Sequence, residues 1–312
     1  MKQNLYNEIV KLLPTAEVMQ QEPMSRHTTF RIGGCADVFV KVSDVSQLQK
    51  LIPELIRNEI PYYVIGKGSN LLVADAGFRG VILQLGEAFE DVVITDNSVV
   101  AGAGAGLAKV AKEAMLRELA GFEFAAGIPG SIGGGVIMNA GAYGGEMKDV
   151  VRLVRFLDED GNVCEYSGEQ MQFAYRNSAL KNRTNCIVLQ VELLLHPGKK
   201  DDILGLMRDL AGRRKEKQPL EYPSAGSTFK RPEGYFAGKL IGDAGLSGYR
   251  IGDAQVSEKH NGFVINKGNA TAADVKALIA HIRQEVYHKF RVMLEPEVIF
   301  LGEFDVETDI AK

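Results

Sequence analysis

The chain has 312 residues, of which 46% are hydrophobic, and its formal net charge at pH 7 is −4. This length allows two domains or three small ones, and the apolar content is enough for a sizeable core. The weak negative charge argues against general binding of nucleic acid through a basic surface, and no apolar run is long enough to span a bilayer.

The first 85 residues predict a small α/β layer. The opening segment MKQNLYNEIVKLLP is amphipathic and lacks the apolar stretch and cleavage site of a signal peptide, so we expect a cytoplasmic protein. The expected elements are a helix over residues 1–20 that Pro14 ends, a helix over 44–60 with Ser43 as its cap and Pro53 as an internal flaw, and strands over 36–42, 62–65, 71–74 and 81–85.

Between residues 90 and 197 the pattern favours strands. The expected elements are a hairpin around Asp96-Asn97, an amphipathic helix over 107–119, a second hairpin over 150–157 and 162–166 with an Asp160-Gly161 turn, and a long buried strand over 186–195. His196-Pro197-Gly198 ends that strand and marks the expected domain boundary.

The last third predicts three helices and a closing strand, over residues 201–217, 237–243, 271–290 and 294–301. Thr271 is the expected N-cap of the third helix, and Asp274 lies three residues on, as in a capping box. The first helix ends in the charged run RRKEKQP (213–219), which is either a solvated helix end or an anion site.

The cysteines and histidines suggest no metal or disulfide chemistry. Cys35, Cys164 and Cys186 are odd in number and widely spaced, which argues against a disulfide framework and a zinc knuckle. No HxxxH pair occurs, so we predict no metal site and expect structural roles for the five histidines, His27, His196, His260, His281 and His288.

Residues 127–146 read GIPGSIGGGVIMNAGAYGGE and form the most informative stretch of the chain. Apolar residues from Ile128 to Met138 run through it, so it belongs to a packed core rather than to a linker. Glycine lets the backbone approach a bound group closely, and free N–H groups suit a phosphate. The alternative is a tightly turned loop that binds nothing.

Familiar nucleotide motifs are absent. Gly102, Gly104 and Gly106 do not make a G-x-G-x-x-G fingerprint, because residue 107 is leucine. The loop 66–69 lacks the glycine that a phosphate loop needs four positions before its G-K-[ST] end. The glycine loops at 66–70 and 127–145 therefore bind a phosphorylated group by another architecture or bind none.

Six motifs occur in a fixed order: RHTTFRIGG (26–34), GKGSNLLV (66–73), GIPGSIGGGVIMNAGAYGGE (127–146), YRNS (175–178), GSTFKRP (226–232) and LEPEV (294–298). Together they closely resemble the MurB family, the UDP-N-acetylenolpyruvoylglucosamine reductases of peptidoglycan synthesis, over residues 20–302. The glycine loops alone indicate only the broader vanillyl-alcohol-oxidase-like flavin fold, whereas the last three motifs specify the reductase. The lack of an insertion between residues 158 and 175 resembles the family's short second type.

The resemblance implies an α+β fold, with a two-lobed PCMH-type FAD-binding region and a C-terminal α/β substrate-binding domain. The implied divisions are a first FAD-binding lobe over 1–83, to which the C-terminal strand 298–312 returns, a second lobe over 84–198, and a UDP-sugar domain over 199–297.

The implied activity is that of a UDP-N-acetylmuramate dehydrogenase with non-covalent FAD. NADPH reduces the flavin, which then passes a hydride to the enolpyruvyl group of UDP-N-acetylglucosamine enolpyruvate and yields UDP-N-acetylmuramate. The implied partners are these small molecules, with no nucleic acid and no membrane insertion, and we expect a monomer.

Three residues match the family's catalytic groups. Hydride addition at C3 leaves negative charge at C2 and on the carboxylate, which the guanidinium of Arg176 is suited to stabilise. Ser227 matches the proton donor to C2, and Lys230 lowers the cost of its alkoxide. Glu297 matches the second acid, and Glu295 lies on the same face of a regular strand. Read without the family, Arg176 and Glu297 are ordinary ion-pair residues and Ser227 is a turn residue.

The expected FAD contacts are main-chain groups of the two glycine loops, at Gly66, Gly68, Ser69, Asn70, Leu71, Gly127, Ile128, Pro129, Gly130, Ser131, Gly134 and Ala140, with Arg31 and Ile187–Leu189 as further candidates. The expected nucleotide-sugar contacts are Lys217, Tyr222, Lys230, Tyr249, Gln255, Lys259 and His260. The chain departs from the family at Arg231, where many members carry asparagine, and at Asn261-Gly262, which replaces alanine-asparagine.

Two other functions stay open. One is an FAD oxidase of an alcohol or sugar, which needs neither YRNS nor the terminal glutamate. The other is a nucleotide-sugar-binding regulator without chemistry, for which a colourless purified protein would argue.

Overall fold

The computed structural model describes residues 2–181, 183 and 185–304, and the chain in it divides into two units. Unit 1 consists of Met1–Gln20, Val38–Lys67 and Gly80–Arg214, and unit 2 consists of Gln21–Asp37, Gly68–Arg79 and Lys215–Lys312. Each unit is therefore built from three separate lengths of chain. Mixed helices and strands in both units agree with the predicted α+β class.

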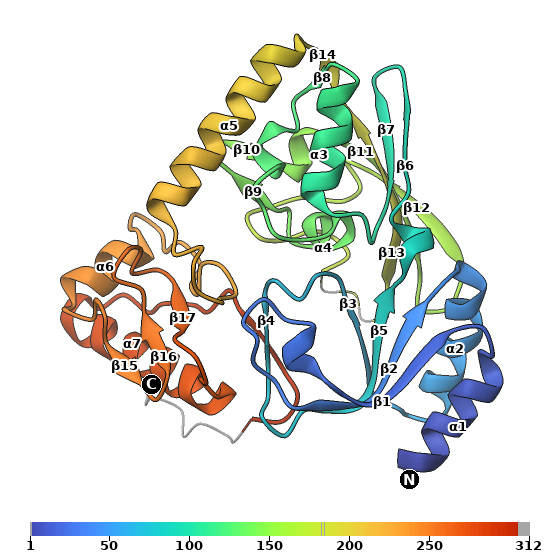
Figure 1. The fold of residues 1–312 in the computed structure, drawn as a ribbon, viewed down its shortest axis with the longest axis horizontal. Helices are drawn as coiled ribbons and strands as arrows, with labels where there is room; N and C mark the ends of the chain where they lie inside the picture. The colour runs from blue at the N-terminus through green and yellow to red at the C-terminus, as the bar shows by residue number, and fades with distance from the viewer. Residues whose placement is uncertain (1, 182, 184, 305–312) are drawn as a thin grey trace. The chain divides into compact units, whose positions relative to one another are not determined.

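The described residues form seven α-helices and eighteen strands (Figure 1). The helices are α1 Lys2–Leu12, α2 Val45–Arg57, α3 Leu107–Leu116, α4 Ile132–Ile137, α5 Lys200–Lys217, α6 Ala237–Asp243 and α7 Ala272–Phe290. The strands are β1 Glu17–Pro23, β2 Cys35–Val42, β3 Tyr62–Ile65, β4 Leu71–Val73, β5 Phe78–Leu85, β6 Val92–Thr95, β7 Ser98–Gly102, β8 Leu119–Ala120, β9 Gly141–Ala142, β10 Gly145–Glu146, β11 Val151–Leu157, β12 Val163–Ser167, β13 Ile187–Leu194, β14 His196–Pro197, β15 Arg250–Ile251, β16 Ala254–Val256, β17 Val264–Asn266 and β18 Ile299–Leu301.

Unit 1 contains a four-stranded sheet in the order β1-β2-β5-β3, in which β3 and β5 run parallel. Alternate residues of the sheet, among them Val40 on β2 and Leu83 on β5, are fully buried against helices α1 and α2. Leu48, Ile52 and the other apolar residues of α2 recur at helical spacing, so that one face of the helix covers the sheet.

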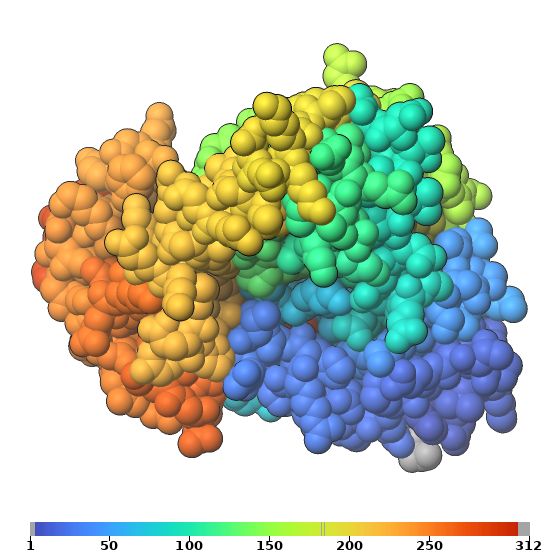
Figure 2. Space-filling model, turned by 45° about the horizontal axis from the view of Figure 1, so that its top comes forward, coloured from blue at the N-terminus to red at the C-terminus, as the bar shows by residue number. Residues whose placement is uncertain are grey.

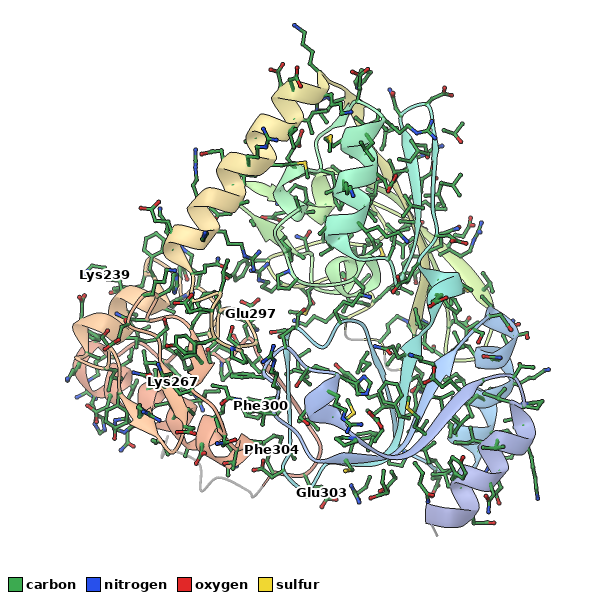
Figure 3. All side chains as sticks on the ribbon, in the orientation of Figure 1. Lys239, Lys267, Glu297, Phe300, Glu303 and Phe304 are labelled. Atoms are coloured by element: carbon green, nitrogen blue, oxygen red, sulfur yellow. The ribbon has the colours of Figure 1, made fainter. Side chains whose placement is uncertain are left out.

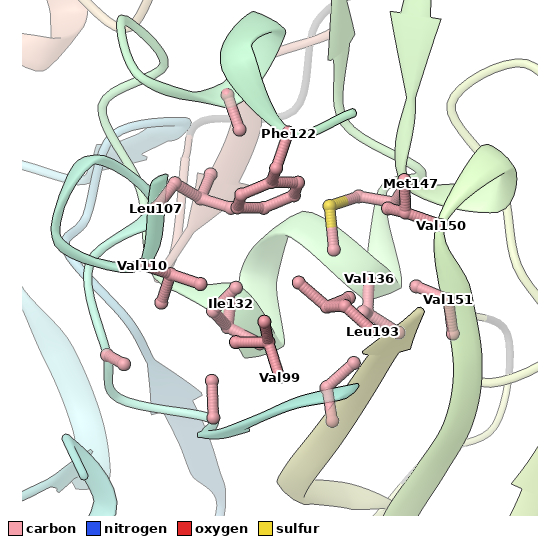
Figure 4. Packing of buried hydrophobic residues seen from close by; sticks show 14 of the residues in the cluster. Val99, Leu107, Val110, Phe122, Ile132, Val136, Met147, Val150, Val151 and Leu193 are labelled. Carbon is pink, nitrogen blue, oxygen red and sulfur yellow. The ribbon is translucent and has the colours of Figure 1, made fainter. Parts of the chain in front are cut away.

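A second sheet of unit 1 is antiparallel, with the order β12-β11-β13-β7-β6. Helices α3 and α4 pack on it and close the largest apolar cluster, part of which Figure 4 shows. In that view Phe122, Leu107 and Met147 lie above α4, whose Ile132 and Val136 are fully buried. The second glycine loop is thus anchored in the core, as the interleaved apolar residues predicted.

Helix α5 runs along the surface of unit 1, where its yellow atoms are visible in Figure 2. Most of its side chains are exposed, and Ile203 is its one buried residue. Unit 1 ends inside this helix, at Arg214, so the predicted boundary at His196-Pro197-Gly198 lies within unit 1. The three-part division of the chain stays a prediction.

Unit 2 packs α6 and α7 against the three-stranded sheet β15-β16-β17. The capping box predicted for α7 is present, because Thr271 Oγ1 accepts from the Asp274 amide and Asp274 Oδ2 accepts from the Thr271 amide, both at 3.0 Å. Strand β18 returns to pair in parallel with β4, at Ile299 and Leu71. The last part of the predicted C-terminal strand, residues 305–312, lies outside the described residues.

Several local predictions were wrong. The first helix ends at Leu12, before Pro14 as predicted, because proline lacks the N–H that a continuing helix requires, but residues 17–20 of the predicted range belong to strand β1. The cap of α2 is Asp44, whose carboxylate accepts from the Gln47 amide, and not Ser43. The helix expected over 107–119 ends at Leu116. Only Ile299–Leu301 of the strand expected over 294–301 pairs with another strand.

Candidate functional site

The two glycine loops of the sequence meet in unit 1 at Gly66 and Ser131. A Cβ placed on Gly66 would lie 2.3 Å from the Ser131 hydroxyl oxygen, so any other residue there would force the Ser131 side chain to move. Ser131 is the N-cap of α4, and its hydroxyl accepts from the Gly134 amide at 3.4 Å. The loops that were expected to hold one cofactor therefore contact each other through residues 66 and 131.

The segment Gly102–Gly106 has a structural role beside the second loop. Ala103 and Ala105 accept hydrogen bonds at their carbonyl oxygens from the amides of Gly133 and Ile132, at 2.9 and 2.8 Å. A Cβ on Gly133 would lie 3.0 Å from the Cβ of Ala103, which is a tight approach. The small residues of this segment allow α4 to pack closely against it. This packing is a structural reason for the glycine-alanine repeat over residues 102–106, which does not match a dinucleotide fingerprint.

The remainder of the first loop belongs to unit 2. Gly68 is left-handed, with φ +60°, and a Cβ there would lie 1.9 Å from the carbonyl oxygen of His27. The Thr29 amide donates to the Gly68 carbonyl, and the Thr29 hydroxyl donates to the Ser224 carbonyl at 2.7 Å. The RHTTF motif therefore fixes the loop from Gly68 onward, and it connects that loop to the segment before Ser227.

Arg176 lies in unit 1 on a loop that returns to α4. Its backbone is left-handed, with φ +53°, and its guanidinium lies 5.5 Å from the ring centre of Tyr175. The side-chain amide of Asn139 donates to the Ala174 carbonyl, and the hydroxyl of Ser178 donates to the Ile137 carbonyl. The pKa of Glu146 is lowered, mainly by its hydrogen bond to Lys148, and the positive charge of Arg176 lowers it further.

Ser227 and Glu297 lie on adjacent segments of unit 2. The amide of Glu297 donates to the carbonyl of Thr228 at 2.8 Å. Thr228 is the residue that directly follows Ser227 in the chain. The side-chain amide of Asn70 donates to the Glu297 carbonyl at 3.1 Å, which joins this pair of segments to the first glycine loop. Glu297 comes two residues before the start of β18, and Figure 3 labels it together with Phe300 of that strand.

Glu295 has a different environment from Glu297. Its carbonyl accepts from the Lys230 amide, and its carboxylate forms an ion pair with the Lys230 ammonium group. That carboxylate is mostly exposed. Lys230, which was expected to assist Ser227 or to bind substrate, therefore already has an acidic neighbour in this structure.

The seven predicted nucleotide-sugar residues all belong to unit 2 and lie around short loops and strands. Tyr222 receives a hydrogen bond from Lys267, whose ammonium group also lies 4.0 Å from the ring centre. Tyr249 stacks on His281, with 4.5 Å between ring centres. Lys267 and His281 were not predicted, because only the folded chain places them beside these two tyrosines.

Three other members of this set make hydrogen bonds with main-chain groups. Lys259 donates to the Lys215 carbonyl at 2.7 Å, and Gln255 donates to the Gly248 carbonyl at 3.1 Å. Nδ1 of His260 accepts from the Gly262 amide, and burial lowers the pKa of His260. His260 is thus favoured in its neutral form. Lys217, the last residue of α5, is exposed.

The further cofactor candidates divide by burial. Arg31 is exposed and left-handed, with φ +56°. Ile187–Leu189 lie in β13 with buried side chains, and the carbonyl of Leu189 accepts from the Ala103 amide. Any contact from β13 would therefore come from its main chain.

Arg214 was missed as an individual residue. It is half-buried on α5, and its guanidinium lies 3.3 Å from the Cβ position of Gly127. Burial lowers the pKa of Arg214, and within the described residues no acid pairs with it. Its neighbour Arg213 is exposed and pairs with Asp209 at 2.7 Å. The charged run 213–219 thus contains both a solvated residue and a candidate anion ligand.

Comparisons with known proteins agree on one family. Residues 36–167 match the FAD binding domain family, and residues 218–301 match the C-terminal domain of UDP-N-acetylenolpyruvoylglucosamine reductase. The chain is 50% identical to UDP-N-acetylenolpyruvoylglucosamine reductase of Clostridioides difficile, over 96% of this chain and 99% of that protein. It is 49% identical to the reductase of Caldanaerobacter subterraneus, over 97% of this chain and 100% of that protein.

A solved structure gives the same result. The crystal structure of UDP-N-acetylenolpyruvylglucosamine reductase (MurB) from Thermus caldophilus matches with a TM-score of 0.77 and 35% identity, over 92% of this chain and 99% of that one. Among the residues that the structure describes, no helix is long and apolar enough to cross a membrane, and no cluster of His, Cys, Asp and Glu side chains could hold a metal ion.

Proposed function

The chain belongs to the UDP-N-acetylenolpyruvoylglucosamine reductase family, and on that basis we propose that it reduces UDP-N-acetylglucosamine enolpyruvate to UDP-N-acetylmuramate with electrons from NADPH. One observation in unit 2 supports the assignment of Ser227 and Glu297 as catalytic residues. The main chain of Glu297 bonds both to Thr228, next to Ser227, and to Asn70 of the first glycine loop. The two proposed catalytic groups of this unit thus lie on segments fixed to a loop proposed to bind the cofactor.

The residues present fit FAD. At Gly66 and Gly68 a Cβ would collide with Ser131 and His27, so the absence of a side chain lets the first loop pack this tightly, and Gly66 keeps part of its surface exposed. The exposed Gly127 has the Arg214 guanidinium beside it, which adds a cation to a main-chain turn and suits a diphosphate. We propose that main-chain groups of both loops hold the cofactor, in the first loop at Gly66 and Gly68–Leu71 and in the second at Gly127–Ser131, Gly134 and Ala140.

When bound, FAD supplies the hydride that NADPH has delivered, and C3 of the enolpyruvyl group accepts it. The protein's own residues stabilise the negative charge that develops on the substrate and supply the proton that C2 takes up. We propose that the guanidinium of Arg176 stabilises the negative charge that develops on the substrate carboxylate, a task for which its permanent charge and planar fork are suited. Glu297 orients the same end of the substrate.

Ser227 supplies the proton that C2 needs. The overall change adds a hydride to C3 and a proton to C2, and the pair of electrons comes from NADPH, which becomes NADP⁺. A serine hydroxyl is a weak acid, but the carbanion-like C2 is a far stronger base than water, so the transfer runs downhill. The serine then regains a proton from solvent.

We further propose that the predicted nucleotide-sugar residues of unit 2, from Lys217 to His260, bind the UDP-sugar. Support for all of them except Lys217 comes from the match of residues 218–301 to the reductase C-terminal domain. The monomeric state and the cytoplasmic location stay predictions.

The experiment that tests the reaction separates its two halves under anaerobic conditions. NADPH should bleach the flavin of the wild-type protein, and UDP-N-acetylglucosamine enolpyruvate should restore its colour. Ser227→Ala should keep the first step and slow the second by about 10²–10⁴-fold. Arg176→Ala should also keep the first step and slow the second by about 10²–10³-fold. Arg183→Ala, which loses an ion pair with Glu159, is the matched arginine control.

Other outcomes would point elsewhere. Rapid reoxidation by oxygen with an alcohol or sugar as electron donor would favour an oxidase. A purified protein that takes up no flavin would favour the regulator. Full activity of Ser227→Ala would remove the proposed proton donor.

A further inference from the structure

Asn139 is a buried polar residue to which the proposed reaction gives no role. Its side chain is 2% exposed, and its backbone is left-handed, with φ +41°. Asparagine tolerates this conformation after a helix, so a plain reading makes Asn139 the residue that ends α4. That reading requires only the backbone, however, and leaves the side chain unexplained.

The side chain of Asn139 joins two separate segments. Its amide group donates to Oε2 of Glu146 at 2.8 Å and to the carbonyl of Ala174 at 3.1 Å, and its Oδ1 accepts from the Lys148 amide at 3.0 Å. None of these partners belongs to α4, whose last residue is Ile137. Every polar position of the side chain is therefore directed to the turn 146–148 or to the loop that carries Arg176.

The loop that carries Arg176 needs such support. Arg176 is a non-glycine residue at φ +53°, a conformation that L-residues disfavour and that persists only when the surroundings impose it. Ala174 and Asn177 close the loop with two main-chain hydrogen bonds of 3.1 Å. Ser178 provides a second attachment, because its hydroxyl donates to the Ile137 carbonyl at 2.9 Å.

We propose that Asn139 is a positioning residue for Arg176. It acts through the Ala174 carbonyl and sets where the loop places the guanidinium, and Ser178 does the same from the other end. The inference rests on the proposed role of Arg176 in the second half-reaction. Because a displacement of about 1 Å at a reacting group can cost about 10²-fold in rate, a missing attachment should be measurable.

A double-mutant cycle on the flavin-loaded protein tests the proposal. Asn139→Gly keeps the left-handed backbone and removes all three side-chain hydrogen bonds. It should leave flavin reduction by NADPH unchanged and slow flavin reoxidation by UDP-N-acetylglucosamine enolpyruvate by about 10- to 100-fold. The effect should fall on the limiting rate more than on the substrate concentration for half-saturation.

The decisive variant combines Asn139→Gly with Arg176→Ala. If Asn139 acts only through Arg176, the double variant should reoxidise within about twofold of Arg176→Ala alone. A merely structural role predicts that the two losses multiply. Gln47→Leu is the matched control, because Gln47 is also buried and makes hydrogen bonds to Ser43 and Thr15. Its loss should affect stability and not the second half-reaction.

The outcomes separate this inference from the proposed function. If Arg176→Ala reoxidises at the wild-type rate, the role of Arg176 fails and the positioning role fails with it. If Arg176→Ala is slow but the Asn139→Gly loss multiplies with it, or if Asn139→Gly equally slows reduction by NADPH, only the positioning role is overturned. Should Asn139→Gly lose its flavin, Ser178→Ala takes its place in the cycle, and the same two results decide.

Discussion

Replacing Gly68 with alanine is the most direct test of the first glycine loop. Two separate penalties apply at this position. An alanine at φ +60° adopts the left-handed conformation, which costs about 1–2 kcal/mol. Its Cβ would also lie 1.9 Å from the His27 carbonyl oxygen, and overpacking of this kind costs about 1–3 kcal/mol.

The carbonyl of His27 cannot easily move away. The amide of His27 donates to Met24, and the hydroxyls of the next two residues, Thr28 and Thr29, donate to the carbonyls of Ile32 and Ser224. Movement of the His27 carbonyl should therefore not relieve the steric overlap. Together with the backbone strain, the overlap should lower the free energy of unfolding by about 2–5 kcal/mol.

Gly234→Ala isolates the first penalty. Gly234 has φ +73°, and nothing lies within 4 Å of its Cβ position, so about 1–2 kcal/mol should be lost. Urea unfolding followed by circular dichroism measures both variants, and the absorbance of the purified proteins measures bound flavin. Gly68→Ala should also lose flavin, whereas Gly234→Ala should keep it. Equal losses of stability in the two variants, with equal flavin content, would refute the argument from close contact.

Three further substitutions test other parts of the structure. Asp75→Ala should cost about 1–2 kcal/mol in thermal unfolding, because the Asp75 carboxylate accepts from the first two amides of α7 at 2.8 and 2.9 Å. Burial lowers the pKa of His260 below 6.5 in the folded state, so the unfolded chain protonates first and stability should fall as the pH drops below about 6.5; His260→Gln should flatten that decline in urea midpoints. Arg214→Met should weaken flavin retention on dialysis, whereas Arg213→Met should not, since Arg213 is exposed.

The parts of the fold that the sequence predicted well have local causes. Helix α6 has the predicted bounds, and α7 begins at the predicted cap, because Thr271 and Asp274 satisfy each other's main-chain groups within four residues. The hairpin at Asp96-Asn97 is likewise a local turn between alternating strands. The sequence signals for them lie within or beside each element, although the distant Asp75 adds to the cap of α7.

The parts that were wrong or unseen depend on distant partners. β1 has mostly polar residues, EVMQQEP, so it has no apolar run and forms because β2 pairs with it. The closing strand is short because only Ile299–Leu301 finds β4, more than two hundred residues earlier, and such a register cannot be read from a local pattern. Asn139 and Arg214 were missed for the same reason, since the contacts that distinguish them come from Ala174 and Gly127.

The connections of Asn70 predict which of two functions one substitution in unit 2 should affect. Its carbonyl accepts from Ile299, which begins the pairing of β4 with β18, and its side-chain amide donates to the carbonyl of Glu297. Asn70→Ala would remove only the second bond, so β18 should stay paired while Glu297 loses one of its two main-chain attachments. If the proposed roles are right, this variant should keep flavin and slow its reoxidation by the enolpyruvyl substrate. Loss of flavin with normal reoxidation of the remainder would instead mean that the Asn70 side chain serves the cofactor loop alone.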